Sequence, residues 1–190
     1  MAEHNYHHGD LRRAVLRAAA EVIDESGPLA VNLRDLARRV GVSHAAPAHH
    51  FGDKTGLLTA LAAEGFELLA DALGAARSTT DIYELGTAYV TFALEHYAHL
   101  DVMFQPSLYR SDDPALVESQ ARAYAALRDA VEELPVTRRG DDLARAMIGA
   151  WSLAHGFAAL WSQQILPSEL GSSPDEAFRA ISRFIFGADS

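Results

Sequence analysis

Residues 32–50 read NLRDLARRVGVSHAAPAHH, and this stretch decides the fold of the first part of the chain. Asn32 is a residue type that caps helices, and apolar side chains follow it at helical spacing. Gly41 supplies a tight turn, and Ser43 is a fresh cap for a second helix that we expect to end near Phe51. A short helix, a glycine turn and another short helix are the layout of a helix-turn-helix.

Helical periodicity continues on both sides of this segment. An apolar stripe over residues 11–22 predicts an amphipathic helix with Asp10 as its cap, and a glycine-proline pair ends it. After a break at Asp53, a long helix is expected over residues 54–77. We therefore expect a three-helix unit followed by a long helix that joins two domains.

The rest of the chain also favours helices. Periodicity and capping signals predict a bent stretch over 101–109 and helices over about 85–100, 114–134, 142–166 and 175–186. No segment has the alternating pattern of a strand, so the predicted fold class is all-α. The apolar stretch 146–166 has nearly the length of a membrane span, but its polar side chains, such as Ser152 and Gln163, favour a buried helix instead.

Composition excludes several classes of site. The 190 residues include no cysteine, which rules out disulfides, zinc ribbons, iron–sulfur clusters and thiol nucleophiles. The N-terminal residues MAEHNYHHGDLRR lack the apolar core of a signal peptide. These two features agree on a cytoplasmic protein.

Charge is distributed unevenly along the chain. Residues 1–56 hold seven basic and seven acidic side chains, together with six of the nine histidines, so their formal charge sums to zero. The formal charge of −10 therefore lies entirely in residues 57–190. We infer that the two parts meet different partners.

The second helix of the helix-turn-helix has side chains suited to the major groove of DNA. In this motif the N-terminal side chains of the second helix contact base edges. Alanine contacts a thymine methyl, histidine hydrogen-bonds a purine edge or a phosphate, and no bulky side chain keeps the helix out of the groove. The side chains expected to be exposed there are His44, Ala45, Ala46 and His49.

Residues 10–61 resemble the DNA-binding domain of the TetR family of transcriptional regulators. The match is carried by the first helix, by LRDLARRVGVSHAAP at 33–47 and by HHFGDKTGLLTAL at 49–61. The resemblance implies that Ser43 caps the recognition helix and that the four residues named above face bases. It also implies that phosphates are held by Arg34, Lys54 and Thr55. Without it, these would be read as surface charges, first-turn residues and surface histidines.

The chain departs from the family pattern at two positions. Many members have a tyrosine that reaches a phosphate where this chain has Ala48, so one positioning contact is lost. Pro47 lies within the recognition helix, which is tolerable near the helix start and costly further in. His50 and Phe51 are expected to pack against the core, where an aromatic ring would hold the helix in place.

The second part of the chain resembles the family more weakly. Residues 151–161, WSLAHGFAALW, are similar to a tryptophan-histidine-glycine signature in one group of its C-terminal domains. The resemblance implies a C-terminal helical domain for ligand binding and dimerisation, with expected domains 1–56 and 57–190. The candidate ligand-binding residues are Phe92, His96, Met103, Phe104, Tyr124, Trp151 and His155. Each could instead be a core residue, because an aromatic stripe at helical spacing more often belongs to a core than to a pocket.

The expected function is that of a ligand-responsive regulator, most simply a repressor. It would bind a palindromic operator in double-stranded DNA as a homodimer and be released by a small molecule, without a cofactor. The helices 142–166 and 175–186 are too apolar for solvent and are the expected dimer contact, because small residues there permit close helix approach.

Three other interpretations compete with this one. A metal site could use His4, His7 and His8 or the histidines at 44, 49 and 50, but adjacent histidines on a helix point about 100° apart. An enzyme is disfavoured because no nucleophile motif, phosphate-binding loop or paired-carboxylate site is present. An all-helical protein-interaction module without DNA binding remains the alternative function.

Overall fold

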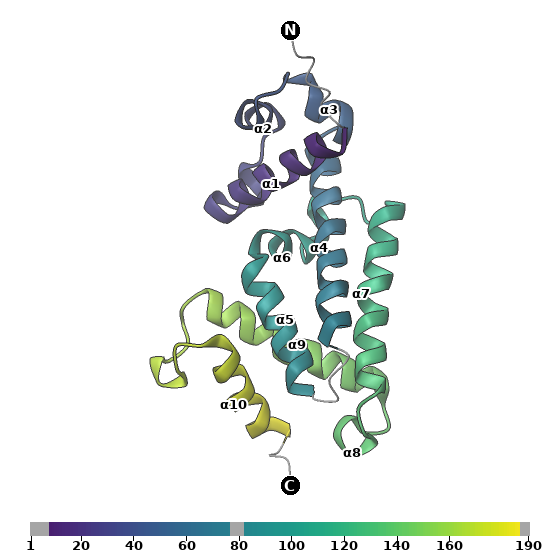
Figure 1. The fold of residues 1–190 in the computed structure, drawn as a ribbon, viewed down its shortest axis with the longest axis vertical. Coiled ribbons are helices and arrows are strands. Elements are labelled where there is room, and N and C mark those ends of the chain that lie inside the picture. Colours follow the sequence, from purple (N-terminus) through teal and green to yellow (C-terminus); the bar gives the residue numbers. More distant parts are fainter. Residues whose placement is uncertain (1–7, 77–81, 187–190) are drawn as a thin grey trace. The chain divides into compact units, whose positions relative to one another are not determined.

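The computed structural model describes residues 8–76 and 82–186, and every regular element in these ranges is helical (Figure 1). The predicted all-α fold class is confirmed. The chain forms two compact units, one built from residues up to Gly65 together with Tyr97–Glu118, the other from Phe66–His96 and the residues from Ser119 onward. The predicted domain boundary after residue 56 separates DNA binding from ligand binding and dimerisation, and it stays a prediction.

Two long helices contribute to both units, namely α4 (Lys54–Ala76) and α7 (Pro114–Glu132). The other helices of the first unit are α1 (His8–Ser26), η1 (Pro28–Ala30), α2 (Leu33–Val40), α3 (Ala45–Phe51), α6 (Tyr97–Met103) and η2 (Pro106–Leu108). The other helices of the second unit are α5 (Ile82–Glu95), α8 (Val136–Arg139), α9 (Leu143–Ser162), η3 (Ser168–Leu170) and α10 (Pro174–Phe186).

Side-chain caps fix the starts of several helices where the sequence predicted them. Asn32 Oδ1 accepts a hydrogen bond from the second backbone N–H of α2, and Asp53 Oδ1 accepts one from the third N–H of α4. Asp113 and Asp142 do the same for α7 and α9, and Ser173 Oγ accepts from the third residue of α10. These bonds satisfy backbone donors that have no acceptor within the helix.

Other predicted helix boundaries were wrong. The first helix begins at His8, before its predicted cap. The single helix expected over residues 85–100 is two helices, because the chain passes from the second unit into the first at Tyr97, and α6 packs on α1 there. Helix α9 ends at Ser162, since Gln164 adopts φ 55°, a left-handed conformation that a right-handed helix cannot continue. The short helix α8 was not predicted.

The core of the first unit is formed where α1, α2 and the start of α4 supply leucines and isoleucines to one interior. Leu16, Ile23, Leu36, Leu58 and Leu61 are all essentially inaccessible to solvent. Truncating one such side chain to alanine costs about 2–5 kcal/mol in a well-packed core. This interior therefore holds α2 and α3 at a fixed angle for whatever they bind.

In the second unit, α5 packs on both α9 and α10 (Figure 1). Gly86 of α5 lets the two backbones approach closely, because a Cβ there would overlap the ring of Phe178 on α10. That ring lies 5.3 Å from the ring of Phe157 on α9, measured between centroids. Among the described residues no helix is long and apolar enough to cross a membrane, including the apolar α9.

Candidate nucleic-acid interface and effector site

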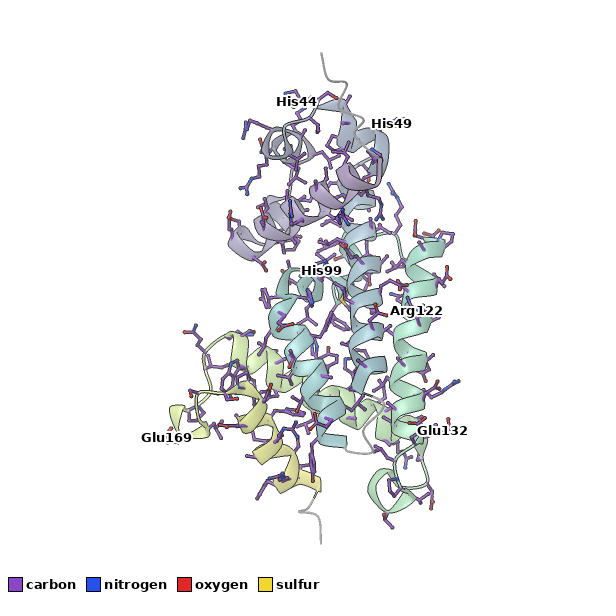
Figure 2. All side chains as sticks on the ribbon, in the orientation of Figure 1. His44, His49, His99, Arg122, Glu132 and Glu169 are labelled. Atoms are coloured by element: carbon purple, nitrogen blue, oxygen red, sulfur yellow. The ribbon has the colours of Figure 1, made fainter. Side chains whose placement is uncertain are left out.

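Helix α3 presents one exposed face at the end of the first unit. His44, Ala45, Ala48 and His49 are exposed there, and Ala46 is half-buried (Figure 2). Three of the four residues expected to face bases therefore share this surface, and Ala48 joins them because it lies four positions after His44. Their roles as base-contacting residues stay predictions.

The start of α3 differs from the expectation. The helix begins at Ala45, so Pro47 is its third residue, where a backbone N–H would have no acceptor within the helix. The predicted side-chain cap at Ser43 is wrong, because the cap position is His44 and no side chain caps the helix there. Ser43 instead accepts a hydrogen bond from Ala46 through its backbone carbonyl, at 3.0 Å. A contact between Ser43 and DNA stays a prediction.

Phe51 holds the C-terminal end of α3, as predicted. Its side chain is only 7% exposed, and the guanidinium carbon of Arg12 on α1 lies 5.8 Å from its ring centroid. Arg12, Arg13 and Arg17 are exposed on α1. Sequence reasoning did not assign these arginines a role, although three basic residues within two turns of one helix were a visible signal.

The three residues expected to hold phosphates have different surroundings. Arg34 is exposed at the second position of α2, and Thr55 is half-buried in the first turn of α4. Lys54 Nζ donates a hydrogen bond to the carbonyl of Leu29 at 2.7 Å, which ties the start of α4 to η1. An ammonium group has three N–H donors, so this bond leaves two for a phosphate.

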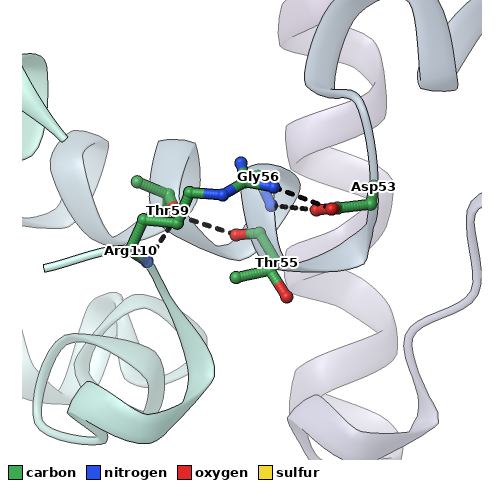
Figure 3. A network of polar contacts seen from close by, with 5 residues as sticks. All are labelled: Asp53, Thr55, Gly56, Thr59 and Arg110. Carbon is green, nitrogen blue, oxygen red and sulfur yellow. Dashed lines mark hydrogen bonds and ion pairs between the residues drawn. The ribbon is translucent and has the colours of Figure 1, made fainter. Parts of the chain in front are cut away.

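A polar network connects the start of α4 to the segment that follows η2 (Figure 3). Asp53 accepts hydrogen bonds from Gly56 N at 2.8 Å and from Arg110 Nη2 at 2.7 Å. Arg110 N donates to Thr59 Oγ1 at 3.0 Å, and this hydroxyl donates to the carbonyl of Thr55. The N–H of Gly56 and then the charge of Arg110 hold the pKa of Asp53 below its ordinary value. The network lies wholly within the first unit.

Two of the residues predicted to bind a ligand meet a tyrosine in the second unit. Tyr89 on α5 lies with its hydroxyl 2.9 Å from His155 Nδ1 and 3.4 Å from Trp151 Nε1, both on α9. Burial raises the pKa of Tyr89 to about 12 and lowers the pKa of His155. Both shifts favour the neutral forms. The tyrosine oxygen accepts from Trp151 Nε1, and the hydroxyl donates to His155 in the tautomer whose Nδ1 is unprotonated. The sequence predicted only a helix around Tyr89 and did not indicate this role.

An open hollow of about 320 Å³ lies between α4 and α5 within the second unit. Its lining includes Leu68 and Ala72 of α4, Thr87 and Phe92 of α5, and His96, which directly follows α5. The rings of Phe92 and His96, both predicted ligand-binding residues, lie 5.4 Å apart between centroids. The hollow therefore combines an apolar wall with polar side chains.

The other predicted ligand-binding residues lie elsewhere. Met103 is buried in the first unit beside Gly65, and Phe104 also belongs to that unit. Tyr124 on α7 is 59% exposed. Their roles, and those of Trp151 and His155, stay predictions.

The described residues contain no cluster of potential metal ligands. Within residues 8–76 and 82–186, no three histidine, aspartate or glutamate side chains lie close enough together to hold a metal ion. His4 and His7 fall outside the described residues, as does the side chain of His8.

The last two helices leave large apolar side chains in contact with solvent. Ile148 and Leu160 on α9 and Ile185 on α10 are exposed, and Phe184 is 90% exposed. Where such side chains lie together on a protein surface, they commonly mark an interaction site.

Comparison with known proteins gives two family matches. A family described as "Bacterial regulatory proteins, tetR family" matches residues 15–61, and one described as "Tetracyclin repressor-like, C-terminal domain" matches residues 82–184. The HTH-type transcriptional regulator BetI of Rhizobium meliloti (strain 1021) is 47% identical over 49 residues, which are 26% of this chain. The match spans 24% of BetI, about a quarter of its length.

Two solved structures cover nearly all of the chain. A protein of unknown function from Rhodococcus sp. RHA1 is 34% identical over 97% of both chains, with a TM-score of 0.79. AibR, solved in complex with isovaleryl coenzyme A and operator DNA, is 15% identical over 94% of this chain and 100% of its own, with a TM-score of 0.69. The second likeness concerns the fold alone.

Proposed function

Because the chain belongs to the TetR family of transcriptional regulators, we propose that it is a homodimeric repressor that binds a palindromic operator and is released by a small molecule. The family consists of regulators rather than enzymes, and residues 82–184 match its ligand-binding C-terminal domain. The observation that carries the proposal is the exposed face of α3. A repressor of this kind acts in the cytoplasm, where it meets its DNA.

The α3 face suits reading by small side chains in the major groove. Ala45 and Ala48 offer methyl groups to thymine, while His44 and His49 offer a ring nitrogen to a purine edge or a phosphate. The backbone of α3 can approach the base edges closely because its exposed alanines are small. Phosphate contacts from Arg34, Lys54 and Thr55 would fix the position of the protein along the DNA, since such contacts position a protein without reading sequence.

Dimerisation would cover the apolar patch of α9 and α10. Nothing lies within 4 Å of a Cβ placed at Gly149 or Gly156, so a partner helix could approach α9 closely at both positions. The same surface on two copies gives a self-complementary, twofold contact. A twofold dimer presents two copies of α3, which is why the proposed operator is palindromic.

Release by a ligand requires that the ligand prefer the conformation unable to bind DNA. Helix α4 is the means of transmission that we propose, because it starts at the Asp53–Arg110 network and continues into the wall of the hollow in the second unit. A coupling of about 1–3 kcal/mol, or roughly 5- to 150-fold in DNA affinity, is typical of allosteric proteins. That AibR was solved with both an acyl-coenzyme A and operator DNA supports pairing these two functions on this fold.

Fluorescence anisotropy with DNA from upstream of the gene tests the proposal. Specific binding is expected, and His44→Ala and His49→Ala should reduce the ratio of specific to non-specific affinity. Lys54→Ala should weaken binding to all sequences about equally. The control is Arg128→Ala, which removes a positive charge from an exposed side chain on α7 and should change little.

The same measurement decides against the alternative. A protein-interaction module would bind specific and random duplexes with equal affinity, and the histidine variants would not change that ratio. Light scattering on the same samples tests the dimer. Phe184→Glu should place a charge in the proposed contact and shift the protein towards monomer.

A further inference from the structure

One face of α5 carries polar side chains into the hollow of the second unit. Glu84, Thr87, Thr91 and Glu95 follow one another at intervals of three or four residues, and all four line it. Residues at this spacing lie on the same side of a helix. The opposite wall, from α4, includes Leu68 and is otherwise rich in alanine. The hollow is thus polar along one wall and apolar along the other.

The charge of this hollow is negative. Its described lining includes two glutamates and no lysine or arginine. Arg179 of α10 donates to Glu84 Oε1 at 2.6 Å and compensates that carboxylate. Glu95 makes no ion pair or hydrogen bond through its carboxylate with any described residue. A ligand entering the hollow therefore meets an uncompensated negative charge, which attracts a cation and repels an anion.

Thr87 supplies a second, independent feature. The residue is 7% exposed, and its hydroxyl is buried without a hydrogen-bond partner among residues 8–76 and 82–186. Buried polar groups in folded proteins are nearly always paired, because leaving one unpaired costs free energy. A donor on a bound ligand would satisfy this oxygen, one and two turns along the helix from Thr91 and Glu95.

Two aromatic side chains also line the hollow. Phe92 and His96 line the same hollow with their rings 5.4 Å apart. Aromatic faces attract organic cations and also pack against apolar groups.

We infer that the effector is an amphipathic organic ammonium ion, whose charged group pairs with Glu95, whose apolar body packs between Leu68 and Phe92, and which carries a second N–H or O–H donor for Thr87, two turns away along α5. The inference rests on the proposed function, since it names the ligand class for the same regulator. Because α4 forms one wall, a ligand in the hollow acts directly on the helix that begins at the DNA-binding unit. Acyl-coenzyme A and other multiply anionic ligands do not fit this lining.

Isothermal titration calorimetry on the full-length protein tests the ligand class with three probes of one carbon skeleton. Phenylbutylammonium is positive, phenylbutanol is neutral and phenylbutyrate is negative. The ammonium ion should bind at least about fivefold more tightly than the alcohol, as expected for one charge pair near a surface, and the carboxylate should bind most weakly. Equal Kd values for the ammonium ion and the carboxylate overturn the inference.

Variants locate the binding. Glu95→Gln should weaken phenylbutylammonium about fivefold and leave phenylbutanol unchanged. Thr87→Val removes the unpaired hydroxyl at nearly constant shape, so thermal stability should hold or rise, and the Kd of phenylbutylammonium, whose single nitrogen pairs with Glu95, should stay unchanged. The matched control is Glu21→Gln, an exposed carboxylate on α1 in the first unit, which should not change the Kd. Equal effects of Glu95→Gln and Glu21→Gln would mean that net charge, not the hollow, sets the affinity, and would overturn the inference.

Operator binding is measured separately, so the two proposals fail in different ways. Specific DNA binding without any preference for the ammonium probe rejects the ligand class and leaves the repressor. Ammonium binding that depends on Glu95, without specific DNA binding, rejects the repressor and leaves the site.

Discussion

Replacing Gly56 by alanine tests how closely α3 and α4 approach each other. A Cβ on Gly56 would overlap the carbonyl oxygen of Phe51 and would lie 2.7 Å from Arg110 Nη1. The arginine can move, but the carbonyl belongs to the backbone at the end of α3. Overpacking costs about 1–3 kcal/mol, and the better helix propensity of alanine returns up to about 1 kcal/mol. We expect a net loss of about 1–2 kcal/mol.

The matched control is the same substitution at Gly74, further along the same helix. Nothing lies within 4 Å of a Cβ there, so Gly74→Ala should stabilise the protein by about 0.5–1 kcal/mol. Urea denaturation followed by circular dichroism measures both variants at one protomer concentration, since dimerisation makes stability depend on concentration. Gly56→Ala should also lower DNA affinity, because α3 must shift. A Gly56→Ala protein as stable as wild type, beside a stabilised Gly74→Ala, would refute this packing.

Three further predictions concern titratable and buried groups. Because the pKa of Asp53 is lowered, this carboxylate contributes its full stabilisation at pH values above the ordinary pKa of 3.8, and the contribution is lost as the pH falls below that value. Asp53→Asn should therefore flatten the acid limb of a curve of unfolding free energy against pH. The lowered pKa of His155 means that wild type loses stability as the pH falls below 6.5, and thermal melts at pH 8 and pH 6 should show less loss in His155→Asn. Tyr89→Phe should lower the free energy of unfolding by about 1 kcal/mol. It should also shift the fluorescence emission of Trp151, which donates a hydrogen bond to the tyrosine hydroxyl.

Helix starts were predictable because their signals are local. Asn32, Asp113 and Ser173 each accept a hydrogen bond within three residues, so the sequence alone contains both partners. The break after Glu95 has no such signal. It follows from the packing of α6 on α1, which joins segments far apart in sequence. The end of α9 at a left-handed Gln164 likewise has no marker, because glycine or asparagine usually occupies such a position.

The candidate sites divide in the same way. The exposed face of α3 was predicted because all of its residues belong to one short helix. The family resemblance implied which of these residues face bases. The ligand-binding set was scattered, since periodicity indicates which side chains are buried but not which helices meet. Tyr89 and Glu95 were not assigned for that reason, although both belong to helix α5, as does the predicted residue Phe92. Arg110 depends on a contact across 57 positions of sequence and could not be foreseen.

Selection of duplex DNA from a random library by the full-length protein tests the central claim most directly. We expect an enriched inverted repeat, with half-sites spaced so that two copies of α3 enter successive major grooves, about one helical turn apart or a multiple of it. A protein carrying His44→Ala and His49→Ala should enrich the same repeat less strongly. Failure of wild-type protein to enrich any sequence, or enrichment of a single half-site bound by a monomer, would contradict the account.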